Sequence, residues 1–246
     1  MTNHYLVGKI FKSQNCGYFE VIDYQNYKNV KVRFLDTGYE VTTQKHIIKS
    51  GRIKDRLLPS VYGVGVIGDK YKSCDGNGKN TKEYDTWIGM LGRCYSDYII
   101  KYPSYKECFV SENFKNYSFF YEWLIKQQGI HIDSYNLDKD LLKKGNKVYS
   151  EDTCLILPTE INNALLKRER NRGDCCIGVS FAKGKYVSTV RLGRGRQKKI
   201  GVFNTENEAF QAYKQAKEQY LKELAEKWKS EIDPRAYDAL INYQVE

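Results

Sequence analysis

The sequence predicts an α+β chain built from several modules, and three changes of pattern along its 246 residues support this interpretation. Short apolar runs alternate with turn signals at the start, helical spacing appears from Tyr84, and three short strands precede a helix after Gly173. We expect a small N-terminal antiparallel β-barrel, a Gly-rich connector, a middle domain with flanking helices, a three-stranded sheet plus helix, and a C-terminal tail. Their expected bounds are 1–60, 61–83, 84–166, 173–230 and 231–246.

Composition limits the class of protein. Hydrophobic residues make up 41% of the chain, which is enough for folded cores. No apolar run is long enough for a membrane span, and the start of the chain lacks the apolar region of a secretory signal, so we expect no membrane partner. Seven cysteines without a CxxC pair favour reduced intracellular thiols, with a mixed zinc site as the alternative.

The positive charge is concentrated in one segment. The formal net charge is +10, from 40 basic and 30 acidic residues. Between Lys167 and Phe203 there are eleven Lys/Arg and two Asp/Glu, which leaves 29 against 28 for the rest of the chain. A merely solvated face would intersperse the two signs, so this segment is typical of a surface that binds phosphates.

The first 60 residues alternate in the manner of half-buried strands. Val30, Val32 and Phe34 are separated by Lys31 and Arg33. The runs YLVGKIF, GYFEVIDY, NVKVRFLD and YEVTT predict a small barrel, which resembles the β modules at the front of phage-type DNA-processing proteins. A docking role and a stabilising role both remain open. The glycine-rich stretch that follows has no GK[ST], so a flexible connector is predicted rather than a nucleotide site.

The middle of the chain predicts two apolar helix faces. Helical spacing places Trp87, Met90, Leu91 and Cys94 on the first of them. The second face carries Phe114, Tyr117, Phe120, Tyr121 and Leu124.

Three segments between Tyr84 and Asn163 are similar to motifs of a known protein family: YDTWIGMLGRCY, YPSYKECFVSENFKNYSFFYEWL and NLDKDLLKKGNKVYSEDTCLILPTEINN. In this order they resemble the phage HNH-type homing endonuclease superfamily. The resemblance implies a ββα-metal domain that uses Mg²⁺ or Mn²⁺. It matches Asp138 to the metal aspartate and Asn162, or Asn163, to the helix ligand, and it places Asn146 near the position that orients the catalytic histidine.

Lys139 stands where that family has its general-base histidine. Lysine side chains are normally protonated at neutral pH, and the flanking Asp138 and Asp140 favour the charged form. The candidate catalytic residues are therefore Asp138, Lys139 and Asn146, with Asp138 and Asn162 as metal ligands and nicking weak or lost. The alternative is a hairpin whose Asp and Lys side chains cap turns and pair with each other.

The basic segment predicts a small sheet covered by a helix. IGVSF, KYVSTVRL and KKIGVF form short strands joined by tight turns, and Asn204-Thr205 followed by acidic residues is typical of a helix N-cap. Strand alternation places Lys185, Val187, Thr189 and Arg191 on one face.

These pieces, with EAFQAY in the helix, resemble the plant ethylene-response-factor (APETALA-type) DNA-binding domain. The resemblance implies that the exposed sheet face enters the DNA major groove. The family's contact positions match Ile177, Ser180, Lys183, Lys185, Thr189, Arg191, Gln197 and Lys199. Most of the plant arginines and tryptophans are absent, so the plant sequence preference does not carry over. Our DNA-binding candidates are Lys183, Lys185, Thr189, Arg191, Arg194, Arg196, Lys198 and Lys199.

These patterns together indicate a DNA-binding protein of phage or mobile-element type, derived from an HNH endonuclease. We expect it to bind double-stranded DNA in the cytoplasm, which would be that of the host cell if a phage encodes it. The alternative is a phage-encoded inhibitor that contacts a host protein of a defence or nucleic-acid-processing complex.

Overall fold

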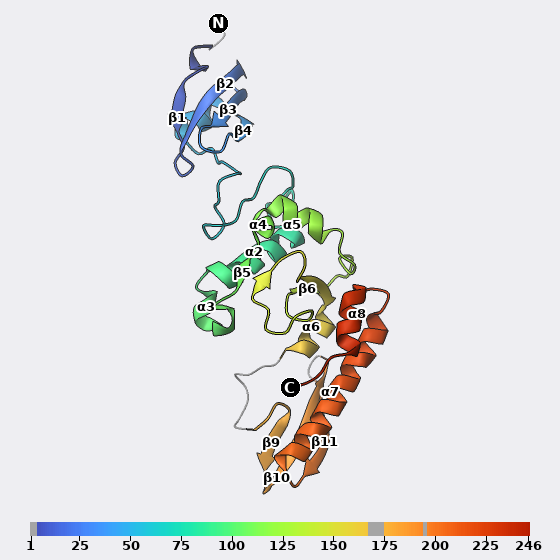
Figure 1. Ribbon diagram of the computed structural model, residues 1–246. Coiled ribbons are helices and arrows are strands. Elements are labelled where there is room, and N and C mark those ends of the chain that lie inside the picture. The colour runs from blue at the N-terminus through green and yellow to red at the C-terminus, as the bar shows by residue number, and fades with distance from the viewer. Residues whose placement is uncertain (1–3, 167–174, 194–195) are drawn as a thin grey trace. The chain divides into compact units, whose positions relative to one another are not determined.

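The protein, described here by a computed structural model, is a mixed α+β chain with several small sheets (Figure 1). The structure describes residues 4–166, 175–193 and 196–246. Its contacts divide the chain into two compact units. One comprises residues 1–106 and 112–121, and the other comprises 107–111 and 122–246. None of the described helices is long and apolar enough to cross a membrane.

The first unit begins with a four-stranded antiparallel sheet of β1 (Ile10–Lys12), β2 (Tyr18–Asn26), β3 (Asn29–Phe34) and β4 (Glu40–Thr43). The predicted alternation is confirmed, because Val30, Val32 and Phe34 are buried and the intervening side chains are exposed. The 3₁₀ turn η1 (His4–Leu6) and helix α1 (Lys45–Ser50) add Leu6 and Ile48 to its core.

The prediction of a closed barrel is wrong. The strands follow the order β1-β2-β3-β4, and β1 and β4 remain as the two edges. Closure would require these two strands to pair, and they are only three and four residues long. Local alternation reports which face of a strand is buried, but it carries no information on that pairing.

The first unit also contains the aromatic helices. They are α2 (Lys82–Tyr95), α3 (Tyr98–Lys101), the 3₁₀ turn η2 (Pro103–Tyr105), α4 (Glu112–Lys115) and the start of α5 (Tyr117–Leu124). Both predicted apolar faces are confirmed. Trp87, Met90 and Leu91 are fully buried on α2, and Trp87 Nε1 donates to the Phe114 carbonyl at 2.7 Å.

The second unit contains a strand–loop–strand–helix segment where the sequence predicts one. Strands β6 (Tyr135–Asp138) and β8 (Leu155–Pro158) pair antiparallel with Asp138 opposite Leu155, and α6 (Thr159–Leu165) follows. We call residues 135–158 the β6–β8 hairpin. Its long loop carries β7 (Val148–Tyr149), which pairs in parallel with β5 (Phe109–Val110).

The predicted sheet plus helix is confirmed. Strands β9 (Val179–Ala182), β10 (Lys185–Leu192) and β11 (Arg196–Phe203) form an antiparallel sheet with β10 in the centre. Helix α7 (Glu206–Trp228) packs on one face of it. Thr205 and Glu208 form a reciprocal capping box at the start of α7, as the Asn-Thr signal predicts.

Helix α7 takes part in two cores. Near its start, Tyr213 packs with Val190 of the sheet. Nearer its end, Leu221 and Leu224 pack with the β6–β8 hairpin, α6 and α8 (Pro234–Ile241). The stretch 231–246, which we expected as a tail, therefore contains a helix, capped by Asp233 and begun by Pro234.

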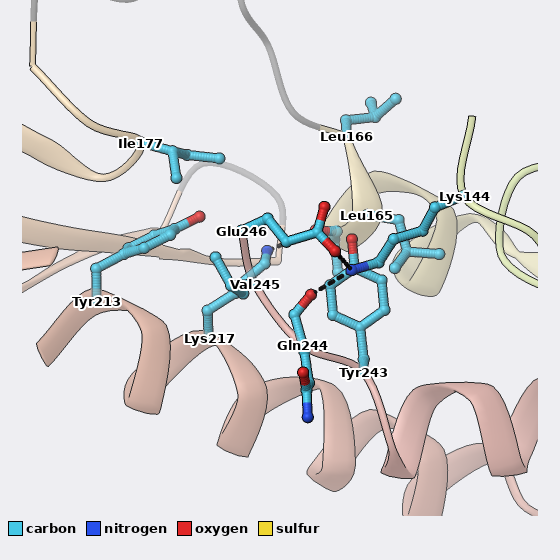
Figure 2. Close-up of a pocket in the computed structure, with 11 residues that line it drawn as sticks. Lys144, Leu165, Leu166, Ile177, Tyr213, Lys217, Tyr243, Gln244, Val245 and Glu246 are labelled. Atoms are coloured by element: carbon cyan, nitrogen blue, oxygen red, sulfur yellow. Dashed lines mark hydrogen bonds and ion pairs between the residues drawn. The ribbon is translucent and has the colours of Figure 1, made fainter. Parts of the chain in front are cut away.

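Residues 243–246 pack between the hairpin loop on one side and the sheet and α7 on the other. Figure 2 shows Lys144 Nζ reaching this segment, where it donates to the Gln244 carbonyl at 2.6 Å and to Glu246 Oε1 at 2.8 Å. The Val245 amide donates to Glu218 Oε1 on α7 at 2.9 Å, and the Val245 side chain is buried beside Val190. The segment thus contributes both charge pairing and apolar contact.

We predict that Gly178→Ala destabilises the sheet more than Gly184→Ala. Both glycines have positive φ, 77° and 75°, so the backbone strain of alanine, about 1–2 kcal/mol, is common to the two variants. A Cβ at Gly178 would lie 2.0 Å from the Tyr213 ring, whereas nothing lies within 4 Å of one at Gly184. Urea unfolding of both variants measures the difference, expected at about 1–3 kcal/mol. Equal losses would contradict the contact between Gly178 and Tyr213.

Candidate nucleic-acid interface

The sheet of β9–β11 has one face covered by α7 and one exposed face. On β10, Ser188 and Val190 are only 0% and 2% exposed, whereas Lys185 and Arg191 are exposed. Because successive strand residues point to opposite faces, Lys185, Thr189 and Arg191 share the face away from α7. The alternation predicted for this strand is therefore confirmed.

Strand pairing decides which β11 side chains share that face. Gln197 lies opposite Arg191, Lys199 lies opposite Thr189, and Gln197 Nε2 donates to Thr189 Oγ1 at 3.1 Å across the strands. Lys198 instead pairs with the buried Val190, so it belongs to the α7 side of the sheet. Lys198 and Lys199 are both exposed, but they lie on opposite faces.

Two further candidate lysines lie at the β9–β10 turn. Lys183 and Gly184 both have positive φ, 52° and 75°, which is the pattern of a type I′ turn that matches the strand twist. The exposed Lys183 side chain is therefore at the tip of the sheet. Lys185 Nζ donates to Asn204 Oδ1, which anchors this lysine just before α7.

The sequence candidates also include Arg194 and Arg196. Arg194 lies outside the described residues. Arg196 begins β11 opposite Leu192, and only its backbone is described.

The exposed face suits a polyanion in charge and in width. The sequence from Cys175 to Phe203 contains no Asp or Glu, so no acidic side chain of these strands offsets their lysines and arginines. Three strands about 4.8 Å apart span about 10 Å between the outer strands, and the DNA major groove is about 12 Å wide.

Lys139 is fixed inside the β6–β8 hairpin. Its side chain is 6% exposed, and Nζ donates to Asp140 Oδ1 at 2.6 Å and to the Asn146 carbonyl at 2.5 Å. The ammonium group also lies 5.7 Å from the centre of the Tyr149 ring. The Lys139 side chain is thus buried, and its amino group is bonded within the loop.

The Asn146 side chain is used within the same loop. Its amide group donates to the carbonyls of Lys139 and Val148 at 2.8 and 2.7 Å, and its oxygen accepts from the Val148 amide at 3.2 Å. Asn146 is buried, so these bonds satisfy groups that water does not reach. The residue expected to orient a catalytic base instead closes the loop around Lys139.

Asp138 caps the turn that follows β6. Its Oδ1 accepts from the amides of Asp140 and Leu141 at 3.0 and 2.8 Å. Burial raises the pKa of this carboxyl group, with the charge of Asp140 in the same direction, while the Leu141 amide opposes the shift. The capping bonds give Asp138 a structural role that does not involve a ligand.

Asp138 and Asn162 are the two metal ligands that the resemblance implies. Asp138 Oδ1 accepts from two amides of the turn, and Asn162 lies on α6. Within the described part of the chain, no three His, Cys, Asp or Glu side chains gather as they would around a cation. We therefore assign no catalytic step to Mg²⁺ or Mn²⁺ at the hairpin.

No known protein family matches the chain, and neither curated proteins nor solved structures match it. The two resemblances therefore depend on the motifs quoted above.

Sequence reasoning missed two residues of the exposed face. Val202 lies opposite Val187 and is exposed, which gives the cationic face an apolar edge. Asn204 was assigned only to the helix cap, yet it also holds Lys185. The register between β10 and β11 shifts between Ser188 and Thr189, so alternation along β11 alone would place Val202 on the other face from Lys199, and no local signal marked the contact of Asn204.

We predict that Asp138→Asn is at least as stable as the wild type at neutral pH, while Asp138→Ala loses about 1–3 kcal/mol. Asparagine keeps the oxygen that accepts from Asp140 and Leu141 and removes a partly buried charge, whereas alanine leaves both amides without this acceptor. Since the pKa of Asp138 is raised in the folded state, folding favours its protonation. The wild type should therefore gain stability relative to Asp138→Asn as pH falls through that pKa.

Urea unfolding at several pH values tests this prediction. A large loss of stability in Asp138→Asn at neutral pH would mean that the carboxylate charge itself is needed.

Proposed function

We propose that this protein binds duplex DNA through the exposed face of β9–β11. The observation that carries the proposal is that Lys185, Arg191 and Lys199 lie on the one face of the sheet that α7 does not cover. Lysine and arginine bind phosphates, and arginine also pairs with guanine edges. Thr189 and Gln197 add neutral donors and acceptors between these cations, as base contacts require.

The β6–β8 hairpin serves as a scaffold in this proposal. Its Asp, Lys and Asn side chains bind one another and the loop backbone, and they hold a folded platform against α7. An endonuclease would instead need a base that can accept a proton and a carboxylate free to bind a cation.

Binding of a host protein is the competing function. An electrostatic contact with DNA weakens steeply as salt rises, whereas a largely apolar protein interface does not. The exposed face is mostly polar and cationic, which favours the DNA interpretation.

We predict that Lys199→Ala weakens duplex binding while Lys198→Ala leaves it within about twofold. The two variants remove the same charge from neighbouring positions, but only Lys199 lies on the exposed face. Each lost phosphate contact should reduce the slope of log affinity against log salt by about 0.9, so Lys199→Ala should also show a shallower slope. Fluorescence anisotropy with a labelled duplex over a salt series measures both quantities. Equal losses in both variants would place the DNA elsewhere.

We also predict that the wild type leaves supercoiled DNA intact in the presence of Mg²⁺ or Mn²⁺. Lys139→His should not create nicking, because an imidazole is too short to keep the bonds to Asp140 and Asn146. It should instead lower stability by about 1–3 kcal/mol by leaving a buried carbonyl unpaired. Agarose gel electrophoresis of the supercoiled DNA measures the nicking. Metal-dependent nicking that Asp138→Asn abolishes would show that the hairpin is an active site.

A further inference from the structure

The N-terminal sheet carries a second cationic surface, far along the sequence from β9–β11. Residues 4–58 contain ten Lys/Arg and five Asp/Glu. Two of these acids are already engaged. Glu40 pairs with Lys31 and Arg33 at 2.6 Å each, and the buried Asp55 accepts from Thr37 Oγ1. Without these two acids and the two bases that Glu40 pairs with, eight Lys/Arg and three Asp/Glu remain in this stretch.

Two exposed tyrosines lie among three of these lysines. Lys9 and Lys45 place their ammonium groups 5.0 and 5.6 Å from the centre of the Tyr5 ring, and Lys28 lies 5.7 Å from that of Tyr27. The Lys45 amide donates to the Tyr27 carbonyl at 2.9 Å, which brings the two groups together. We call Tyr5, Lys9, Tyr27, Lys28 and Lys45 the tyrosine–lysine cluster.

The cluster is exposed, and its charges are not neutralised within the protein. The two tyrosines, Tyr5 and Tyr27, are 56% and 63% exposed. Among the residues that the structure describes, none of Lys9, Lys28 and Lys45 forms an ion pair with a carboxylate. An aromatic surface edged by unneutralised cations is complementary to a partner with flat rings and negative charge.

The backbone holds the cluster in place. Leu6, next to Tyr5, is buried in the sheet core, and the Gly8 amide donates to the Val21 carbonyl at 2.8 Å. Asn26 Oδ1 accepts from the amides of Lys28 and Asn29 at 2.9 and 3.1 Å, which fixes the turn that presents Tyr27. A preorganised platform loses little conformational entropy when it binds.

We propose that the tyrosine–lysine cluster binds single-stranded nucleic acid. The tyrosine rings would stack on bases, and the lysines would contact the adjoining phosphates. A duplex has the same phosphates, but its base faces are stacked on one another and are closed to a tyrosine ring. This contact is separate from the duplex site proposed for β9–β11 and would give the chain a second mode of binding.

The test compares oligo(dT) with a duplex, both labelled with fluorescein, on the full chain at low salt. The double variant Tyr5→Ala/Tyr27→Ala should lose at least about tenfold in oligo(dT) affinity, since one stacked base contributes about 1–3 kcal/mol. Its duplex affinity should remain within about twofold of the wild type. The variant Tyr5→Phe/Tyr27→Phe keeps both rings and should bind oligo(dT) as the wild type does.

Tyr18→Ala is the matched control. Tyr18 is 51% exposed and lies 5.9 Å from Lys12, but it is at the other end of β2, about 25–30 Å from Tyr27. It should leave oligo(dT) binding within about twofold. An unchanged affinity in the double alanine variant, an equal loss in Tyr18→Ala, or an equal loss for the duplex would each overturn the proposal. A loss in the phenylalanine variant would do the same, because it would show that stacking is not the interaction.

Discussion

The burial of α7 is the constraint on which the second unit depends. At about 1.5 Å per residue, its 23 residues span about 34 Å, long enough to enter two cores. Tyr213 completes the apolar side of the three-stranded sheet, and Leu221 and Leu224 complete the core of the hairpin and α8. A three-stranded sheet needs a hydrophobic face or a covering helix to be stable, and because α7 covers one face of this sheet, the other face can remain polar.

The two faces of that sheet carry different kinds of side chain. The covered face contains the buried Ser188 and Val190, with Lys198 on the same side, and the exposed face contains Lys185, Arg191 and Lys199 beside Val202. Repulsion among like charges on one face opposes folding, and the packing on α7 must outweigh it. Binding of a polyanion would relieve the same repulsion. The arrangement therefore links the stability of the sheet to the presence of a ligand.

Local patterns predicted much of the fold because their causes are local. The β10 alternation reflects a two-residue period, and the start of α7 follows from Thr205 and Glu208. Features that depend on distant pairing were not accessible, such as the open edges of β1 and β4. The candidate site was harder for the same reason. Lys139 could be recognised as a departure from the HNH pattern, but its burial depends on Asn146, which closes the loop from seven residues away.

The contact of Lys144 with Gln244 has a consequence for the order in which the chain folds during synthesis. The two residues are 100 positions apart, and a ribosome adds residues at about 5–20 per second. The hairpin loop therefore emerges about 5–20 s before the segment that secures it, and before the apolar residues of α7 that cover β8. During that interval Leu155 and Leu157 lack the partners that bury them. The nascent hairpin thus exposes apolar side chains that the finished protein buries, which favours aggregation during synthesis.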